Sequence, residues 1–134
     1  MEQDEKTILV IDDNADYLFT METFLRRNGF QVFTAADGQK ALELADEQVP
    51  DLILLDVMME SMYSGFEICR RLRNDAALAE IPIIGISGMK DELGVQIDLH
   101  RDADYFSPDH FFDKPVDKSE LLRTIQALLG LKSG

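Results

Sequence analysis

The chain has 134 residues, a length typical of one domain, and 46% of them are hydrophobic, which excludes a disordered or low-complexity segment. It carries 13 basic and 26 acidic residues, and the formal net charge of −13 argues against direct binding of nucleic acid or an anionic membrane. A single cysteine, Cys69, excludes an internal disulfide, and no apolar run reaches the ~18 residues that span a bilayer. With an acidic, non-signal start, these features predict a cytoplasmic protein with one domain over residues 1–134 and its core at about 7–130.

Two strand–helix pairs are predicted in the first half of the chain. Short apolar runs rich in β-branched residues indicate buried strands, and apolar residues three to four positions apart indicate helices. Gly29 is placed to end the first helix, Asp37 to cap the second, and Pro50 to terminate it. In chain order the elements are strand 7–11, helix 16–28, strand 30–35 and helix 38–48.

The second half of the chain continues the same alternation. A polar loop over 60–65 separates a strand from the next helix, and Asp117 with Glu120 forms a capping box before the last helix. The segment 102–109 is not assigned to an element. In chain order the elements are strand 52–55, helix 66–74, strand 83–86, helix 90–101, strand 110–112 and a helix that carries Leu121 through Leu129.

Five strands alternating with five helices predict an α/β fold, in which helices cover both faces of a parallel sheet. With right-handed crossovers, the best-fitting topology is a doubly wound, flavodoxin-like sheet with strand order 2-1-3-4-5. Sheets of this kind bind ligands outside the carboxyl ends of their strands. The residues that follow the strands are therefore the candidate site residues.

Reactive side chains follow four of the predicted strands. Strand one ends at Asp12 and Asp13, strand three at Asp56, strand four at Ser87 and strand five at Lys114. At a separation of about 4 Å and an effective dielectric of about 20, two carboxylates repel by about 4 kcal/mol. Either one carboxylate stays protonated or a cation neutralises the group. Because oxygen ligands suit a hard cation, and a site with few protein ligands leaves positions open for water, Mg²⁺ fits better than Ca²⁺. A carboxylate nucleophile with Mg²⁺, an ammonium and a hydroxyl is equipped to accept a phosphoryl group.

These residues carry a strong resemblance to a known family. Taken together and in order, the motifs resemble receiver domains of two-component response regulators, of the single-domain type found among chemotaxis regulators. The resemblance extends from about Thr7 to Leu129. Its motifs are Ile11-Asp12-Asp13, Leu54-Leu55-Asp56-Val57-Met58-Met59, Ser87-Gly88 and Asp113-Lys114-Pro115.

The resemblance implies a metal site and a phosphoacceptor. Asp56 matches the phosphoacceptor of the family. Asp13, Asp56 and the backbone carbonyl of Met58 match the positions that ligate Mg²⁺, with Asp12 acting through water.

It also implies the residues of the switch. Ser87 matches the hydroxyl that bonds the phosphoryl group, and Lys114 matches the lysine that pairs with it. Phe111 matches the aromatic switch position, three residues before that lysine. On phosphorylation, the face formed by helix four, strand five and helix five would change its partner binding.

Two segments depart from the family pattern. Met59 is followed by Glu60, where the family often has proline, and the loop to Gly65 is one residue longer. The segment between Ser87 and Lys114 is several residues longer than usual. The second departure falls in a region that often carries output, so it bears on which partner is recognised.

Plainer interpretations stand beside these roles. Asp12 and Asp13 could form a solvated turn, Lys114 could be a surface lysine, and Phe111 could be a strand aromatic without a switching role. The other residues with a plainer interpretation are Cys69 as a small core residue, Arg70, Arg71 and Arg73 as a solvated helix face, and His100 and His110 as residues without a metal role.

The resulting hypothesis is a signalling switch and not a metabolic enzyme. It would take a phosphoryl group from the phosphohistidine of a histidine kinase or phosphotransfer protein onto Asp56, with Mg²⁺. The other expected partner is a downstream target or an output domain, and a homodimer is compatible with the sequence. One alternative is a degenerate receiver that binds partners without phosphorylation, and another is a hydrolase with Asp56 as its nucleophile. The sequence leaves open whether the chain stands alone or is excised from a longer regulator.

Overall fold

The structure is a computed structural model that describes residues 5–56, 64–87, 110–113 and 115–131. Its centre is one five-stranded parallel sheet with the order β2-β1-β3-β4-β5, which is the order predicted from the sequence. Each strand lies within about one residue of its predicted bounds. The strands are β1 (Thr7–Ile11), β2 (Gln31–Ala35), β3 (Leu52–Asp56), β4 (Ile83–Ser87) and β5 (His110–Asp113).

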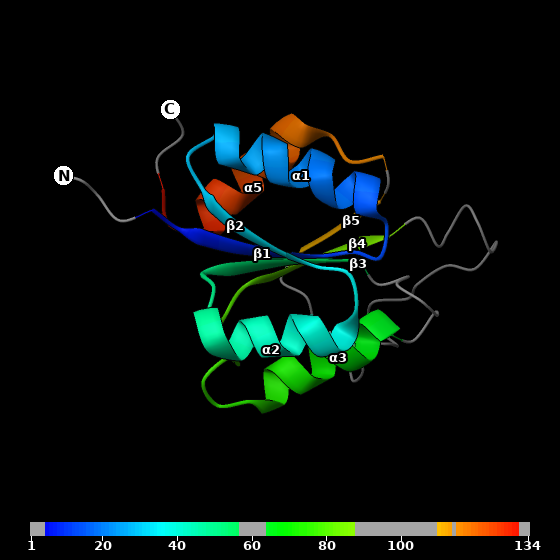
Figure 1. Ribbon diagram of the computed structural model, residues 1–134. Helices are drawn as coiled ribbons and strands as arrows, with labels where there is room; N and C mark the ends of the chain where they lie inside the picture. Colours follow the sequence, from blue (N-terminus) through cyan, green and yellow to red (C-terminus); the bar gives the residue numbers. More distant parts are fainter. Residues whose placement is uncertain (1–4, 57–63, 88–109, 114, 132–134) are drawn as a thin grey trace.

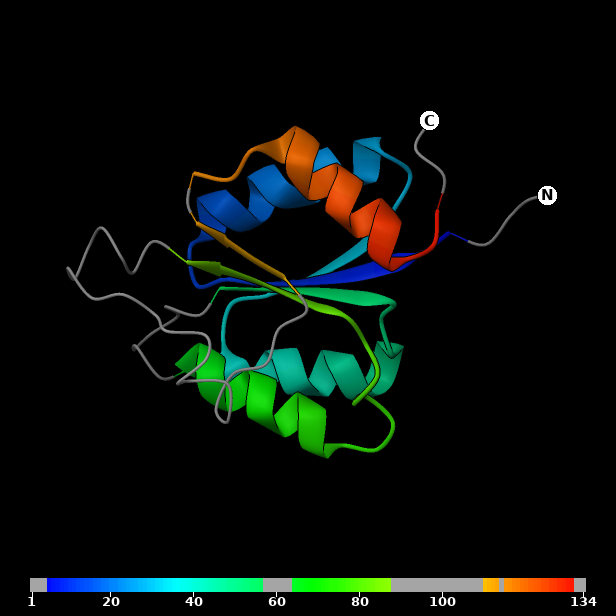
Figure 2. The ribbon, with the colours of Figure 1, turned by 180° about the vertical axis from the view of Figure 1, so that it is seen from behind.

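Helices cover both faces of this sheet, as predicted. Figure 1 shows α1 (Ala15–Arg27) and α5 (Lys118–Leu128) on one face, and α2 (Gly38–Gln48) and α3 (Ser64–Asn74) on the other. Figure 2 shows the same two layers from behind, with the sheet between them. The helix expected over 90–101 lies outside the described residues.

Helix ends follow the capping residues that the sequence offers. Asn14 caps α1 by accepting the Tyr17 N–H at 3.0 Å, and Asp37 caps α2 by accepting the Lys40 N–H at 2.8 Å. After α1 the chain turns through Gly29, whose φ of 92° is open to glycine at little cost. Helix α3 begins at Ser64, two residues before its predicted start at residue 66. Glycine destabilises a helix mainly when it lies in the helix interior. Gly65 lies in the first turn of α3, so the helix can begin before it.

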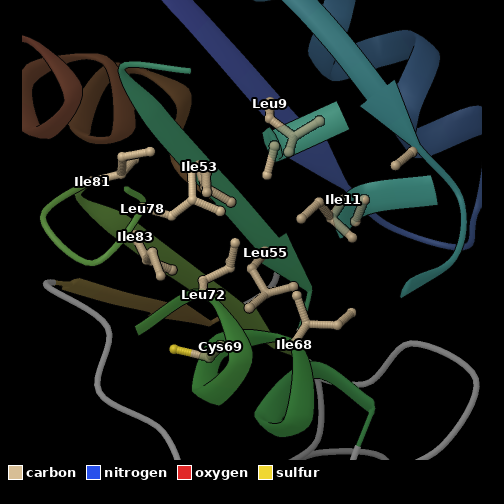
Figure 3. Packing of buried hydrophobic residues seen from close by; sticks show 13 residues of the cluster. Leu9, Ile11, Ile53, Leu55, Ile68, Cys69, Leu72, Leu78, Ile81 and Ile83 are labelled. Atoms are coloured by element: carbon tan, nitrogen blue, oxygen red, sulfur yellow. The ribbon is translucent and has the colours of Figure 1, made fainter. Parts of the chain in front are cut away.

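The side chains of each strand alternate between two buried clusters. Leu9, Ile11, Ile53 and Leu55 pack toward α2 and α3, together with Cys69, which is fully buried as expected of a core residue (Figure 3). The intervening strand residues belong to the cluster under α1 and α5, and they include Ile8, Val10, Leu52, Leu54, Ile84 and Ile86. Because the two clusters fix which residues face each layer, they also fix the direction of the side chains at the strand ends.

The prediction of a wholly solvated arginine face on α3 is wrong for Arg73. Arg70 and Arg71 are exposed, but Arg73 is half-buried. Its guanidinium donates hydrogen bonds to the backbone carbonyls of Ala79 and Ile81, at 3.0 and 2.8 Å. Residues 75–82 form the connection to β4, and its buried backbone carbonyls need hydrogen-bond donors. Arg73 supplies two of them.

Candidate functional site

The candidate site is built from the ends of the two central strands. Strands β1 and β3 are parallel neighbours, with Val10 aligned with Leu54. Asp12 follows Val10 by two residues, and Asp56 follows Leu54 by two residues. The Asp12 N–H donates a hydrogen bond to the Ala35 carbonyl at 3.1 Å, which continues the pairing of β1 with β2. Side chains two residues apart on a strand point to the same face. Asp12 and Asp56 are therefore directed to the same side of the sheet, at neighbouring strand ends.

Three carboxylates meet at this point. Asp12, Asp13 and Asp56 each place one oxygen so that the three lie within 4.8 Å of one another. Asp12 and Asp56 are buried, with 1% and 5% of their surface exposed, and Asp13 is exposed. Two carboxylates of the site thus lie inside the protein, and the third lies at its surface. This is the convergence that the sequence predicted for these three residues.

The sequence around Asp12 holds this carboxylate in place. Its Oδ1 accepts the Asn14 N–H at 2.9 Å, and Asn14 in turn caps α1. The strand, the acidic pair and the helix start are consequently one continuous unit. In Figures 1 and 2, α1 begins at the end of the sheet where β1 and β3 finish.

The donor set fits a hard divalent cation. Two unit charges 4 to 5 Å apart repel by about 3 to 4 kcal/mol at an effective dielectric of about 20. A cation held between the three carboxylates would replace this repulsion with attraction. The site offers a small number of oxygen donors, and one of them is exposed. This suits Mg²⁺, because Mg²⁺ binds few protein oxygens and keeps several of its waters. The residues present therefore fit the metal that the sequence predicted.

Tyr17 is a neighbour of this site that sequence reasoning missed. Its hydroxyl oxygen is buried, and its ring packs against the cluster under α1 and α5. Burial of the phenol, together with the smaller effect of the charges of Asp12 and Asp56, raises the pKa of Tyr17 from 10.0 to about 12. The signal available in the sequence was the position of Tyr17 in the first turn of the helix that directly follows the acidic pair.

The other predicted site residues are described only in part. Ser87 is the last residue of β4 and is aligned with Asp113, and Phe111 lies in β5 opposite Gly85. Ser87 therefore lies at the end of its strand, as predicted, and Phe111 lies within β5. The structure does not describe the side chains of these two residues. Met58 and Lys114 lie outside the described residues altogether.

A sheet of this order with an acidic cluster at the ends of β1 and β3 defines a class of α/β proteins that bind ligands at the carboxyl edge of the sheet. The family model for the response regulator receiver domain matches residues 8–126. The chain belongs to this family, the receiver domains of two-component signal transduction.

Curated relatives of similar sequence are response regulators. Protein PilH of Pseudomonas aeruginosa is 32% identical over 91% of this chain and 96% of its own length. Two transcriptional regulatory proteins, PhoP of Bacillus subtilis and AfsQ1 of Streptomyces coelicolor, are 33% and 37% identical over 92% of this chain. The chain spans about half the length of these two regulators, 48% and 51%.

Solved structures give the same fold. The chemotaxis protein CheY4 of Vibrio cholerae superposes with a TM-score of 0.81 at 26% identity, covering 93% of this chain and 99% of CheY4. The receiver domain of the sensor histidine kinase PA1611 of Pseudomonas aeruginosa has a TM-score of 0.80 at 25% identity, covering 95% of this chain and 99% of that domain. That receiver domain was solved with a magnesium ion coordinated in its active site cleft.

None of the helices over the described residues has the length and apolar character that crossing a bilayer requires.

Proposed function

We propose that this receiver domain is a phosphorylation-controlled switch that accepts a phosphoryl group on Asp56. The observation that carries the proposal is the meeting of Asp12, Asp13 and Asp56 within 4.8 Å at the ends of β1 and β3. Asp56 is the member of this group on the central strand β3, and only 5% of its surface is exposed. An aspartate in such a site can form an acyl phosphate directly.

The cation belongs to the same proposal. Asp13 and Asp56 would hold Mg²⁺ together with the backbone carbonyl of Met58, and Asp12 would act through water. When bound, the ion would neutralise the phosphoryl oxygens and the crowded carboxylates. A magnesium ion in the cleft of the PA1611 receiver domain supports this assignment.

The chain's own residues supply the acceptor and the contacts to the transferred group. An oxygen of the Asp56 carboxylate forms a bond to phosphorus while the phosphorus–nitrogen bond of the donor phosphohistidine breaks. The electron pair of that bond stays on the imidazole. Lys114 would pair with the phosphoryl oxygens, and the Ser87 hydroxyl would donate a hydrogen bond to one of them.

The signal would leave the site through Ser87 and Phe111. These residues belong to neighbouring strands, since β4 and β5 are paired. Inward movement of Ser87 and Lys114 would change the space available to the Phe111 ring, and the face of helix four, β5 and α5 would bind differently. The partners of this proposal are a histidine kinase or phosphotransfer protein and a downstream target or output domain, in the cytoplasm.

In this proposal the protein is not a metabolic enzyme and catalyses only its own phosphorylation and dephosphorylation. A degenerate receiver is not favoured, because its expected signature is loss of the acid pair, the acceptor or the lysine. Asp12, Asp13, Asp56 and Lys114 are all present in the sequence. A phosphatase that uses Asp56 transiently would need a general acid nearby, and Met58 cannot donate a proton.

The test is incubation with a small acyl-phosphate donor and Mg²⁺, followed by intact mass and peptide mapping. We expect one added phosphoryl group on Asp56, and none in Asp56→Asn. The matched control is Asp46→Asn, which removes an exposed carboxylate on α2 and should leave the reaction unchanged. Full labelling of Asp56→Asn, or labelling in excess chelator, would refute the assignment.

A further inference from the structure

Asn14 connects the acidic site to the first turn of α1 through three hydrogen bonds. Its N–H donates to Oδ1 of the buried Asp12 carboxylate at 2.9 Å. Its side-chain oxygen accepts the Tyr17 N–H at 3.0 Å, and its backbone carbonyl accepts the Leu18 N–H at 3.0 Å. One residue therefore holds a carboxylate of the site with its N–H and the start of the helix with its two oxygens.

The side chain of Asn14 keeps this N–H directed at Asp12. Asn14 has the extended backbone of an N-cap residue, with a φ of −93° and a ψ of 111°, so it lies outside the helical path. The bond from its side chain to the Tyr17 amide joins this extended residue to the helix. Without that bond the first turn opens more often, because the first amides of a helix have no partner within the helix. The backbone of Asn14 then rotates more freely, and its N–H no longer stays at the Asp12 oxygen.

A fixed Asp12 carboxylate favours the binding of a cation. Oxygens of Asp12, Asp13 and Asp56 lie within 4.8 Å of one another. Like charges at this separation repel, so a carboxylate that is free to rotate turns away from its neighbours when no cation is bound. Cation binding then includes the cost of returning and immobilising that side chain. A carboxylate that the Asn14 N–H already holds avoids this cost.

We propose that Asn14 is a positioning residue of the acidic site, because its N–H holds the Asp12 carboxylate and its side chain keeps that N–H in place. Cation binding and the first turn of α1 consequently stabilise each other. The inference rests on the proposed function, because it takes the acidic group to be a Mg²⁺ site. By thermodynamic linkage, loss of the cap weakens cation binding by the factor by which the cation strengthens the cap.

The first measurement is Mg²⁺ affinity, determined by titration calorimetry. Asn14→Ala removes the oxygen that accepts the Tyr17 N–H and keeps the backbone N–H. We expect it to bind Mg²⁺ about threefold to tenfold more weakly than wild type, which corresponds to the cost of immobilising one side chain. Asn14→Ser provides another acceptor at the N-cap and should bind Mg²⁺ within about twofold of wild type.

The matched control is the cap of α2. Asp37 follows the edge strand β2, and its carboxylate accepts the Lys40 N–H at 2.8 Å in the same way. Asp37→Ala removes this cap and Asp37→Asn keeps it, while both remove the same charge. Asp37→Ala should be the less stable of the two in urea, but their Mg²⁺ affinities should agree within about twofold. Affinities that differ as much as those of Asn14→Ala and Asn14→Ser would overturn the inference, because any weakened helix would then affect the site.

The second measurement is amide hydrogen exchange of wild type in chelator and in saturating Mg²⁺. The cation should slow exchange at Tyr17 and Leu18 by about threefold to tenfold more than at Lys40 and Ala41, which make the corresponding bonds at the start of α2. In Asn14→Ala this difference should disappear. An equal effect of Mg²⁺ at the starts of both helices in wild type would contradict the coupling.

The outcomes separate this inference from the proposed function. Equal Mg²⁺ affinity of wild type and Asn14→Ala, or an Asn14→Ser that binds as weakly as Asn14→Ala, overturns the inference and leaves the proposed function standing. A wild type that does not bind Mg²⁺ overturns both the metal site and the inference, while phosphorylation of Asp56 is measured independently by mass. Should circular dichroism show that Asn14→Ala is unfolded, Asn14→Gly takes its place, because glycine lacks the acceptor but is a better N-cap than alanine.

Discussion

Asp13 differs from its two neighbours at the residue scale, because it is exposed while Asp12 and Asp56 are buried. Its charge still adds to the repulsion within the group, although water screens it. We expect Asp13→Asn to raise the free energy of unfolding by roughly 1 kcal/mol in metal-free buffer, and to weaken the stabilisation by Mg²⁺. Urea unfolding with and without chelator measures both effects.

Asp16→Asn is the matched control for that change. Asp16 is an exposed acid in the first turn of α1, where the helix dipole favours a negative charge. Its removal should lower stability by about 0.5 kcal/mol and leave the Mg²⁺ response intact. A loss of stability in metal-free Asp13→Asn would mean that the carboxylates are not crowded as the structure places them.

Tyr17 gives a second prediction at this scale, because its pKa of about 12 lies above the ordinary value of 10.0. A raised pKa means that the folded state keeps the phenol proton to higher pH than the unfolded state. The contribution to stability is therefore complete below pH 10 and is lost as pH rises from 10 to 12. Between these values, wild type should lose more stability than Tyr17→Phe, measured by urea unfolding at stepped pH. Parallel curves for the two proteins would contradict the burial of this hydroxyl beside Asp12 and Asp56.

At the scale of elements, the connection from α3 to β4 depends on one side chain. Arg73 bonds to the Ala79 and Ile81 carbonyls, and Ile81 is buried in the cluster under α2 and α3. Arg73→Met keeps an apolar stem but leaves these carbonyls without their donor. We expect a loss of about 1 to 3 kcal/mol in the free energy of unfolding, measured by denaturant titration.

The same helix provides the control. Arg71→Met removes an exposed arginine two residues earlier and should change stability by about 0.5 kcal/mol or less. Equal effects of the two substitutions would show that the bonds of Arg73 contribute nothing beyond those of a surface arginine.

At the scale of the whole molecule, the acidic group and helix α2 occupy different parts of the sheet. The acidic group lies at the ends of β1 and β3, and α2 packs on the face away from α1 and α5. We expect hydrogen exchange with beryllofluoride, a phosphoryl mimic, to change around Phe111 and the 90–110 segment and little in α2. The physical reason is that a close-packed core deforms little. A switch between two arrangements of the strand ends therefore leaves the packing of α2 unchanged.

Ser87→Ala tests the route of this change. The variant should still accept a phosphoryl group on Asp56, while the exchange response around Phe111 weakens. A full response in Ser87→Ala would place the coupling elsewhere. A 90–110 segment that does not respond would assign its extra length to something other than switching.

The sequence by itself determined the five strands and their order in the sheet, the four helices among the described residues, and the meeting of the three carboxylates. Apolar runs such as Thr7–Ile11 and residues 52–55 are buried on both faces, and together with the alternation of strands and helices they predict a parallel sheet between two helical layers. Because parallel strands end at one edge, Asp12, Asp13 and Asp56 could be placed together before any coordinates. Caps such as Asp37 were equally local, since the side chain and the amide that it binds are three residues apart.

Only the tertiary structure decided what Tyr17 and Arg73 do. Both have ordinary local signals, an inward aromatic in an amphipathic helix and a basic residue near a helix end. The groups that act on them come from other elements. Burial and the charges of Asp12 and Asp56 raise the pKa of Tyr17, and the carbonyls before β4 accept the hydrogen bonds of Arg73. A hydrophobic period records which face of a helix is buried, but it carries no information about the polar groups that meet it there. Contacts between polar groups of different elements depend on how the two helical layers pack against the sheet. That packing exists only in the folded chain.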